Sequence, residues 1–238
     1  MTDEPAEERQ TPKTWGIVSG TLWALFAFLS PQFFLLPFVS IIRDLKIDRN
    51  AKVFLIQGVS ELASIIILWF ILKYRYHTNL RSLGLGKFSL GGASWALLAF
   101  PAYLLMSILA SSLVGALFSV DLTQEQNVGY NVGPLGGPEL FLVFVGLVLL
   151  APFVEELVFR GFLFSAFRRK FGFWFGSLLV SLLFAVAHGQ LNVGIDVFVL
   201  SMFLCYLRER TGSLWPAIAL HMLKNLVAFL VLFIIGVS

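Results

Sequence analysis

Long apolar stretches alternate with short polar ones along most of the chain. A helix needs about 20 consecutive apolar residues to cross the hydrocarbon core of a bilayer. Stretches that approach or exceed this length can be drawn at 15–42, 53–72, 93–118, 139–164, 172–188, 193–207 and 214–237. The pattern predicts an all-α fold, a polytopic membrane helix bundle with about seven (six to eight) transmembrane helices.

The composition agrees with a membrane protein and excludes several other classes. Of the 238 residues, 58% are hydrophobic and 13% are charged, whereas soluble domains have about 45–50% apolar and about 25% charged residues. High hydrophobicity with low charge also excludes intrinsic disorder of the whole chain. The single cysteine, Cys205, excludes an intrachain disulfide. No basic run interleaved with aromatic residues suggests a nucleic-acid partner.

The polar and apolar segments divide the chain into three parts. Residues 1–14 are polar, contain two prolines and are expected to form a disordered tail. Residues 15–130 are expected to form the N-terminal transmembrane helices, and residues 135–238 a helical core. The first apolar run is longer than the apolar region of a secretory signal, so we expect it to be retained as a membrane span.

The distribution of Lys and Arg predicts an orientation in the membrane. Bases gather in the loops at 73–92, 165–171 and 208–213, and are lacking at 119–138 and 188–192. Because short cytoplasmic loops carry the excess of bases, seven spans would place the N-terminus in the cytoplasm and the C-terminus outside.

One loop disagrees with this orientation. The segment 43–52 carries four bases on the nominal outside. Either the run 15–42 is not a single simple span, or this loop is an exception to the rule.

Seven charged side chains fall inside the apolar stretches or at their edges. Even the mildest insertion scales assign about 2.5–3.5 kcal/mol to a charge at the centre of a membrane helix, so such residues are candidates for function. Glu139 follows Gly136, Gly137 and Pro138 and is interpreted as a helix-start acid. The other six are Glu61, Glu155, Glu156, Arg160, Asp196 and Lys224.

Three of these charges lie inside the fourth stretch, in a segment of only six residues. Glu156 and Arg160 are four residues apart, acid first, a spacing that suits an ion pair on one helix face. Glu155 points about 100° away from that pair and is left free of it. Pro152 can open the helix locally and free backbone carbonyls for a polar cavity.

Imidazole groups occur at depths that match this acidic pair. His188 ends the fifth stretch, and His221 and Asn225 share one face of the seventh. A carboxylate and an imidazole can together activate a water, and His and Asn can donate hydrogen bonds to a developing oxyanion. Two imidazoles and a carboxylate could also ligate zinc, although the helical HExxH zinc signature is absent.

These residues resemble the motifs of the CPBP family, which comprises type II CAAX prenyl proteases and bacterial Abi proteins linked to bacteriocin processing and self-immunity. The family pattern is EExxxR, then FxxxH, then HxxxN or HxxxD. In this chain the three motifs are Glu155-Glu156-xxx-Arg160, Phe184-xxx-His188 and His221-xxx-Asn225. The resemblance covers roughly residues 135–238, and Lys224 is an extra charge inside the third motif.

The resemblance implies an intramembrane endopeptidase. In it Glu155 and His188 would activate the water, and His221 and Asn225 would stabilise the oxyanion. Glu156 and Arg160 would orient the site, and Phe184 would pack beside it. The family has been described both as metalloproteases and as glutamate proteases. We favour the metal-independent form, and if a divalent metal such as zinc is present its ligands would be Glu155, His188 and His221.

The expected partners are membrane lipid and a peptide or protein substrate that enters a membrane cavity, and the resemblance implies a prenylated substrate as one form. The short chain and a cavity toward the cytoplasmic side fit a multi-pass protein of a bacterial plasma membrane, with an organelle or endoplasmic reticulum membrane as the alternative.

Two other classes of function stay open from the sequence. Buried Glu, His and Arg also mark the ion pathways of a proton-coupled transporter, although two related halves with broken helices are not evident. A noncatalytic immunity or assembly factor of the same fold is the other alternative. Glu61 and Asp196 are interpreted first as helix–helix contacts, the latter with Lys224 as a partner, and second as substrate-gating groups.

Overall fold

The computed structural model describes residues 14–86, 88–119, 128–132 and 135–236, and within these ranges it is helical and contains no strand. The polar tail predicted at residues 1–14 lies, except for Thr14, outside the described residues. The bundle begins with α1 (Ile17–Asp44), α2 (Arg49–Phe70), the short segments η1 (Ile71–Arg75) and η2 (Leu80–Leu83), and α3 (Leu90–Phe118).

The second half is built from one long interrupted helix followed by two more. In order they are α4 (Gly137–Val143), η3 (Phe144–Leu150), α5 (Ala151–Glu156), η4 (Leu157–Leu163), α6 (Phe164–Ala187), α7 (Leu191–Thr211), α8 (Trp215–Phe229) and η5 (Leu230–Ile235). Among the described residues six continuous helices are long and apolar enough to cross a membrane. This confirms the predicted helical membrane bundle.

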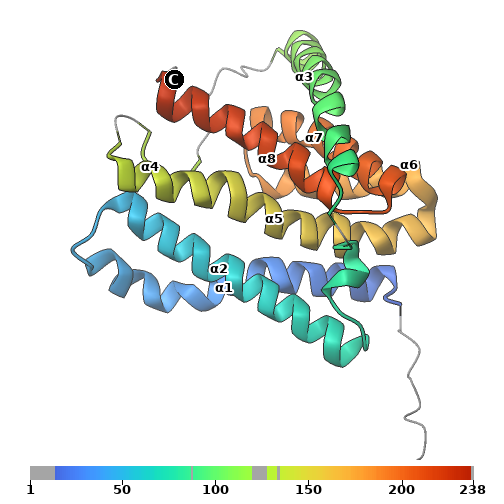
Figure 1. Ribbon diagram of the computed structural model, residues 1–238, viewed down its shortest axis with the longest axis horizontal. Coiled ribbons are helices and arrows are strands. Elements are labelled where there is room, and N and C mark those ends of the chain that lie inside the picture. Colours follow the sequence, from blue (N-terminus) through green and yellow to red (C-terminus); the bar gives the residue numbers. More distant parts are fainter. Residues whose placement is uncertain (1–13, 87, 120–127, 133–134, 237–238) are drawn as a thin grey trace, which may run out of the picture.

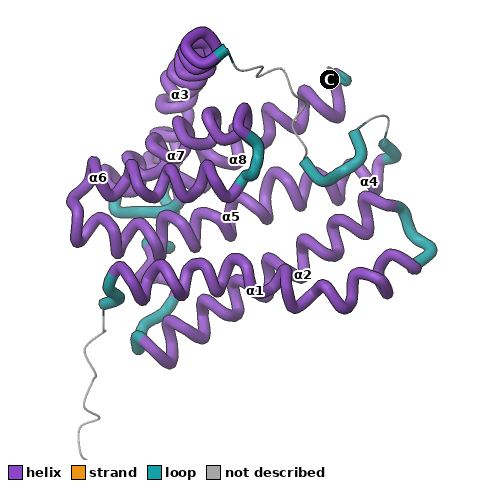
Figure 2. Tube along the Cα trace, turned by 180° about the vertical axis from the view of Figure 1, so that it is seen from behind, coloured by secondary structure: helices purple, strands orange, loops and turns teal. Residues whose placement is uncertain are grey.

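The longest of the six, residues 137–187, contains two of the predicted spans because it folds back on itself. Gly172 has φ +75° and ψ −177°, values that interrupt the helix. After this turn Gly176 lies so close to the preceding arm that an added Cβ would be 3.0 Å from the backbone nitrogen of Arg168. The chain therefore forms a tight helical hairpin whose turn lies within α6, at the end of the bundle where the α5 arm reverses direction in Figures 1 and 2.

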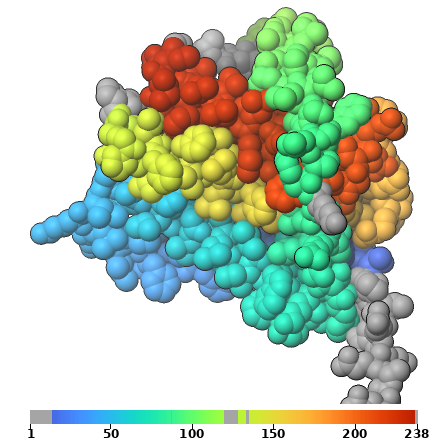
Figure 3. Space-filling view, viewed as in Figure 1, coloured from blue at the N-terminus to red at the C-terminus, as the bar shows by residue number. Residues whose placement is uncertain are grey.

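The hairpin separates the remaining helices into two groups. Helices α1 and α2 pack against each other and cover one side of the α4–α5 arm, and α7 and α8 pack with α6 on the other side (Figure 1). Helix α3 contacts α7 and α8 and lies steeply across them at the outside of the molecule, as the space-filling view in Figure 3 also shows.

The base-rich loops meet at one end of the bundle. The Arg168 guanidinium pairs with Glu209 at 2.7 Å, and the Leu214 backbone N–H donates to the Gly84 carbonyl at 3.0 Å. Arg169 also donates to the carbonyl of Trp15, which precedes α1. These contacts agree with the predicted grouping of the loops at 73–92, 165–171 and 208–213 on the same side.

The exceptional loop at 43–52 lies at the opposite end. There Asn50 accepts a hydrogen bond from the Asn131 backbone N–H at 2.8 Å. Since α1 runs unbroken from Ile17 to Asp44 with both of its prolines inside, the run 15–42 is one helix. The loop is therefore an exception to the distribution of bases.

Large apolar side chains are exposed along nearly every helix of the bundle, which would be costly in water and is favourable in lipid. They include Phe33, Phe34, Leu98, Ile108, Leu117, Trp174 and Ile235. The buried core is formed mainly where η4, α6 and α7 meet, around Leu157, Phe162, Phe184 and Cys205. This same region carries the charged residues singled out by the sequence.

The close approach at the hairpin generates a stability prediction. Gly176→Ala places a methyl group 3.0–3.2 Å from backbone atoms of Phe167 and Arg168, which cannot move aside like a flexible side chain. We expect a loss of about 1–3 kcal/mol in the free energy of unfolding, measured by denaturant titration in mixed micelles. The control is Gly91→Ala in α3, where the new methyl group meets no atom within 4 Å. Equal stability of the two variants would contradict the tight hairpin.

Candidate active site

The helix that carries Glu155 and Glu156 has an altered backbone hydrogen-bond pattern just before these two residues. In η3 the hydrogen bonds span five residues, so the Ala151 N–H donates to the Gly146 carbonyl. Pro152 has no N–H, and the Leu147 carbonyl five residues earlier is therefore left without its backbone donor. The side-chain amide of Asn225 donates to it at 2.9 Å. This fulfils the expectation that Pro152 frees a carbonyl for polar contacts.

A second polar contact on the same segment was missed by the sequence analysis of the site. Gln57 on α2 donates from Nε2 to the Gly146 carbonyl at 3.1 Å, and the Tyr130 hydroxyl donates to Gln57 Oε1. Gln57 lies one turn before Glu61 on the same face of α2, so this pair of polar residues within an apolar stretch was the available signal.

Glu156 and Arg160 form the predicted ion pair. Arg160 Nη1 donates to Glu156 Oε1 at 2.7 Å, and both side chains are completely buried. The guanidinium also lies over the ring of Phe184, with Cζ 4.3 Å from the ring centroid. The pair thus joins η4 to α6 through a charged group and an aromatic face.

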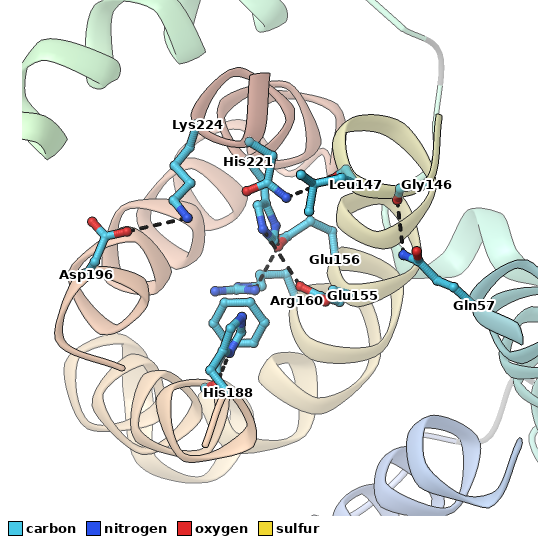
Figure 4. Close-up of polar contacts among 12 residues, drawn as sticks. Gln57, Gly146, Leu147, Glu155, Glu156, Arg160, His188, Asp196, His221 and Lys224 are labelled. Carbon is cyan, nitrogen blue, oxygen red and sulfur yellow. Dashed lines mark hydrogen bonds and ion pairs between the residues drawn. The ribbon is translucent and has the colours of Figure 1, made fainter. Parts of the chain in front are cut away.

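His221 lies between the two glutamates, as Figure 4 shows. Its Nδ1 is 2.9 Å from Glu156 Oε1, and its Nε2 is 3.7 Å from Glu155 Oε2. The Glu155 side chain is 18% exposed, whereas Glu156 is fully buried. The two adjacent acids therefore occupy different environments: Glu156 fixes the imidazole from within, and Glu155 faces the accessible side.

His188 is positioned by the end of α6 rather than by an acid. Its Nδ1 is 2.8 Å from the Phe184 carbonyl. The Phe184 ring packs edge-on against both imidazoles, with centroid distances of 4.8 Å to His188 and 5.9 Å to His221. The predicted packing role of Phe184 agrees with this placement between the two histidines.

The structure therefore brings together Glu155, Glu156, Arg160 and His221 by direct polar contacts. His188 joins the group through the Phe184 ring, and no direct contact between His188 and Glu155 occurs among the described side chains. Asn225 lies one turn beyond His221 on α8 and contacts the Leu147 carbonyl.

Lys224 has the partner that the sequence suggested. Its Nζ is 3.5 Å from Asp196 Oδ2, and the hydroxyls of Tyr103 and Ser107 both donate to Asp196 Oδ1. These groups link α3, α7 and α8 beside the site. Tyr103 and Ser107 were missed, although two polar residues one helical turn apart in an apolar stretch were a signal. Glu61 lies on α2, the helix that packs against α4, η3 and α5.

The donor set does not form a metal centre as it stands. No group of three His, Cys, Asp or Glu side chains within the described ranges is close enough to hold a metal ion. The conditional ligand set of Glu155, His188 and His221 does not fit a zinc ion in this arrangement and stays a prediction.

Comparison with known proteins points to the same segment. Residues 137–227 match the family model "Type II CAAX prenyl endopeptidase Rce1-like". An Escherichia coli protein described as "Uncharacterized 24.3 kDa protein" is 34% identical over 90 residues, which cover 36% of this chain and 42% of that protein. The Bacillus subtilis protein "Putative membrane peptidase YdiL" is 24% identical over 169 residues, 70% of this chain and 67% of that protein. No solved structure matches the chain.

The family match contains all three motifs, and the alignment with the E. coli relative covers less than half of that protein's length. The resemblance to the CPBP family predicted from the motifs is confirmed. The family match and the peptidase relative together support an intramembrane protease.

The buried ion pair generates a prediction about stability. Arg160→Met leaves the Glu156 carboxylate buried without its cation, and we expect a loss of about 3–5 kcal/mol in the free energy of unfolding. Replacing both partners, by Glu156→Gln with Arg160→Met, should recover a large part of this loss. The measurement is denaturant unfolding in mixed micelles.

The matched control is Arg168→Met, which removes the cation of an ion pair at the exposed end of the bundle. Such pairs contribute about 0.2–1 kcal/mol. If Arg160→Met and Arg168→Met destabilised the protein equally, Glu156 would not be the buried, charge-compensated group described above.

Proposed function

We propose that this chain, a CPBP-type intramembrane protease by its motifs and its family match, hydrolyses a peptide bond with a water that Glu155 activates. The observation that carries the proposal is the position of His221. Its imidazole is held at Nδ1 by Glu156, 2.9 Å away, while Nε2 faces Glu155 at 3.7 Å. A fixed imidazole beside a partly accessible carboxylate provides the two groups that water activation and oxyanion stabilisation require.

The neighbours of His221 define its proton arrangement. Glu156 is paired with Arg160 and is therefore an anion that only accepts, so His221 Nδ1 carries a proton. If His221 is an imidazolium, its positive charge and that of Arg160 balance the two negative charges of Glu155 and Glu156. In that form Nε2–H can donate a hydrogen bond to the oxygen of a tetrahedral intermediate. Asn225 donates one amide N–H to the Leu147 carbonyl. Its second amide N–H can donate to the oxygen of the tetrahedral intermediate, as His221 does.

The proposed reaction uses Glu155 as the general base. Glu155 takes a proton from water as the hydroxyl oxygen bonds to the carbonyl carbon of the substrate. The protonated Glu155 then delivers this proton to the amide nitrogen as the carbon–nitrogen bond breaks. His188 assists by orienting the water: its Nδ1–H must donate to the Phe184 carbonyl, which only accepts, so Nε2 is left to accept a hydrogen bond from the water.

The surroundings of the site support a substrate carried by the membrane. An apolar groove of about 740 Å³ lies between α3, the end of α6 and α7, and its lining includes Ala185 and Gly189, which flank His188 in the sequence. We propose that it receives apolar side chains, or a prenyl group, of a peptide or protein substrate. The gathering of three base-rich loops at one end supports an N-terminus in the cytoplasm, and we propose a bacterial plasma membrane as the location.

Cleavage by the purified chain in liposomes tests the proposal. We expect Glu155→Gln to lower the cleavage rate by about 10²–10⁴-fold, the usual contribution of a general base, without changing the unfolding midpoint. The probes are a farnesylated reporter peptide and its unmodified counterpart, together with a comparison of new protein N-termini in membranes containing the native chain or Glu155→Gln.

The control is Glu139→Gln, which removes an acid from the first turn of α4 outside the site and should leave cleavage unchanged. Undiminished cleavage by folded Glu155→Gln would exclude Glu155 as the base. If the native chain released no new N-termini at all, a noncatalytic role would replace the protease. Proton flux in the same liposomes without cleavage would instead favour the transporter.

A further inference from the structure

The Arg160 guanidinium has more donors than protein acceptors. Nη1 donates to Glu156, but Nε and Nη2 have no hydrogen-bond partner among the described residues although both are fully buried. On the carboxylate, Oε2 of Glu156 is buried and unpartnered in the same way. In a protein surrounded by lipid, each such group has lost its contacts with bulk water and needs a replacement.

Buried hydroxyl groups occur on the face of α6 that carries Phe184, the residue whose ring lies against Arg160. Ser177 and Ser181 are one turn apart and fully buried, and Phe184, whose ring covers Arg160, follows three residues after Ser181 on the same face. Elsewhere in the bundle Ser64, Ser165 and Thr211 satisfy their hydroxyls with the carbonyl four residues earlier. The hydroxyls of Ser177 and Ser181 make no such bond.

Helix α7 provides a matching stripe. Ser201 is fully buried with an unpartnered hydroxyl, and Cys205 lies one turn later. Cys205 belongs to the same buried cluster as Phe184, whose ring lies against the Arg160 guanidinium, so the stripes on α6 and α7 share one core beside the ion pair. A thiol is only a weak hydrogen-bonding group. It does not replace the oxygen acceptors that the guanidinium lacks.

The stripe on α7 continues to the base-rich end of the bundle. Arg208 lies one turn beyond Cys205 on the same face, and its Nε is also buried without a partner. It passes over Gly84, where an added Cβ would lie 2.8 Å from Arg208 Cζ. Polar groups therefore extend from the loop end of the bundle to the Glu156–Arg160 pair. We name the set Ser177, Ser181, Ser201, Cys205 and Arg208 the polar seam.

We propose that the polar seam holds a chain of internal water molecules that connects the base-rich end of the bundle with the Glu156–Arg160 pair and supplies water to the site. Water fits these groups because it both donates and accepts, and buried waters in proteins make two to four such bonds. A bound anion does not fit, because Glu156 already compensates the charge of Arg160. The supply of water rests on the proposed hydrolysis, but the hydration of the seam does not.

Radiolytic labelling tests the hydration directly. Hydroxyl radicals formed from an internal water oxidise the side chains beside it, and sulfur is the preferred target. Cys205 is the single cysteine of the chain and is completely buried, which makes it a reporter of internal rather than bulk water. We expect its rapid oxidation in the native full-length protein. The control combines Cys205→Ser with Ala217→Cys, because Ala217 is equally buried within an apolar cluster, and that thiol should stay intact.

Two substitutions at Ser181 introduce side chains of the same shape and distinguish an effect on hydration from an effect on packing. Ser181→Val fills the seam with methyl groups, and Ser181→Thr has nearly the same volume but keeps the hydroxyl. We expect Ser181→Val to lower Cys205 oxidation and the kcat for peptide cleavage several-fold with KM unchanged, and Ser181→Thr to restore both. Ser201→Val provides a second variant if Ser181→Val fails to fold, and Ser64→Val, outside the seam, should change neither measurement.

Each result decides a separate point. Oxidation of Cys205 no faster than at the Ala217→Cys thiol means that the seam is dry and overturns the proposal. An unchanged kcat in a valine variant that protects Cys205 overturns the supply of water. Absence of cleavage by the native chain contradicts the proposed protease, while the labelling still reports on the seam.

Discussion

The site depends on a fully buried ion pair inside a membrane bundle. Removing Glu156 and Arg160 from both water and lipid headgroups is favourable only when each partner compensates the other at hydrogen-bond distance, and they do so at 2.7 Å. The other contacts build on this pair. Glu156 uses the same oxygen to hold His221, and the Phe184 ring covers the guanidinium and packs against both histidines. His221 is thus positioned by a charge that is itself not exposed, and His188 is linked to it through the Phe184 ring.

The backbone contributes as much to the site as the side chains do. In a bilayer an irregular helix is tolerated only where other groups satisfy its carbonyls. The missing N–H of Pro152 creates this requirement at Leu147, where Asn225 on α8 meets it, and Gln57 on α2 is a second donor to the Gly146 carbonyl. The segment leading to Glu155 is therefore tied to both neighbouring helices. This explains why the first half of the chain, which carries none of the three motifs, still matters for their geometry.

The sequence predicted contacts within one helix well and contacts between helices poorly. The Glu156–Arg160 pair followed from spacing alone, since residues four apart share a helix face. The spans followed from apolar length, and the fourth and fifth are the two arms of the hairpin that reverses at Gly172. The contact of His221 with Glu156 rather than with Asn225 depends on how α8 is rotated against α5. The contacts of Tyr103 and Ser107 with Asp196 depend on the tilt of α3. The periodicity of the sequence does not reveal how one helix is rotated or tilted against another. The Asp196–Lys224 pair was foreseen because few buried charges were available to match.

The different origins of the two intramembrane ion pairs also bear on how the protein enters the membrane. Glu156 and Arg160 belong to one helix, so their charges can neutralise each other as soon as that helix forms, before any other helix is in place. Asp196 and Lys224 belong to consecutive helices, α7 and α8, and can neutralise each other only when both have been inserted. The costliest charges of the chain therefore enter the bilayer already compensated. The later pair instead favours insertion of the last two helices together.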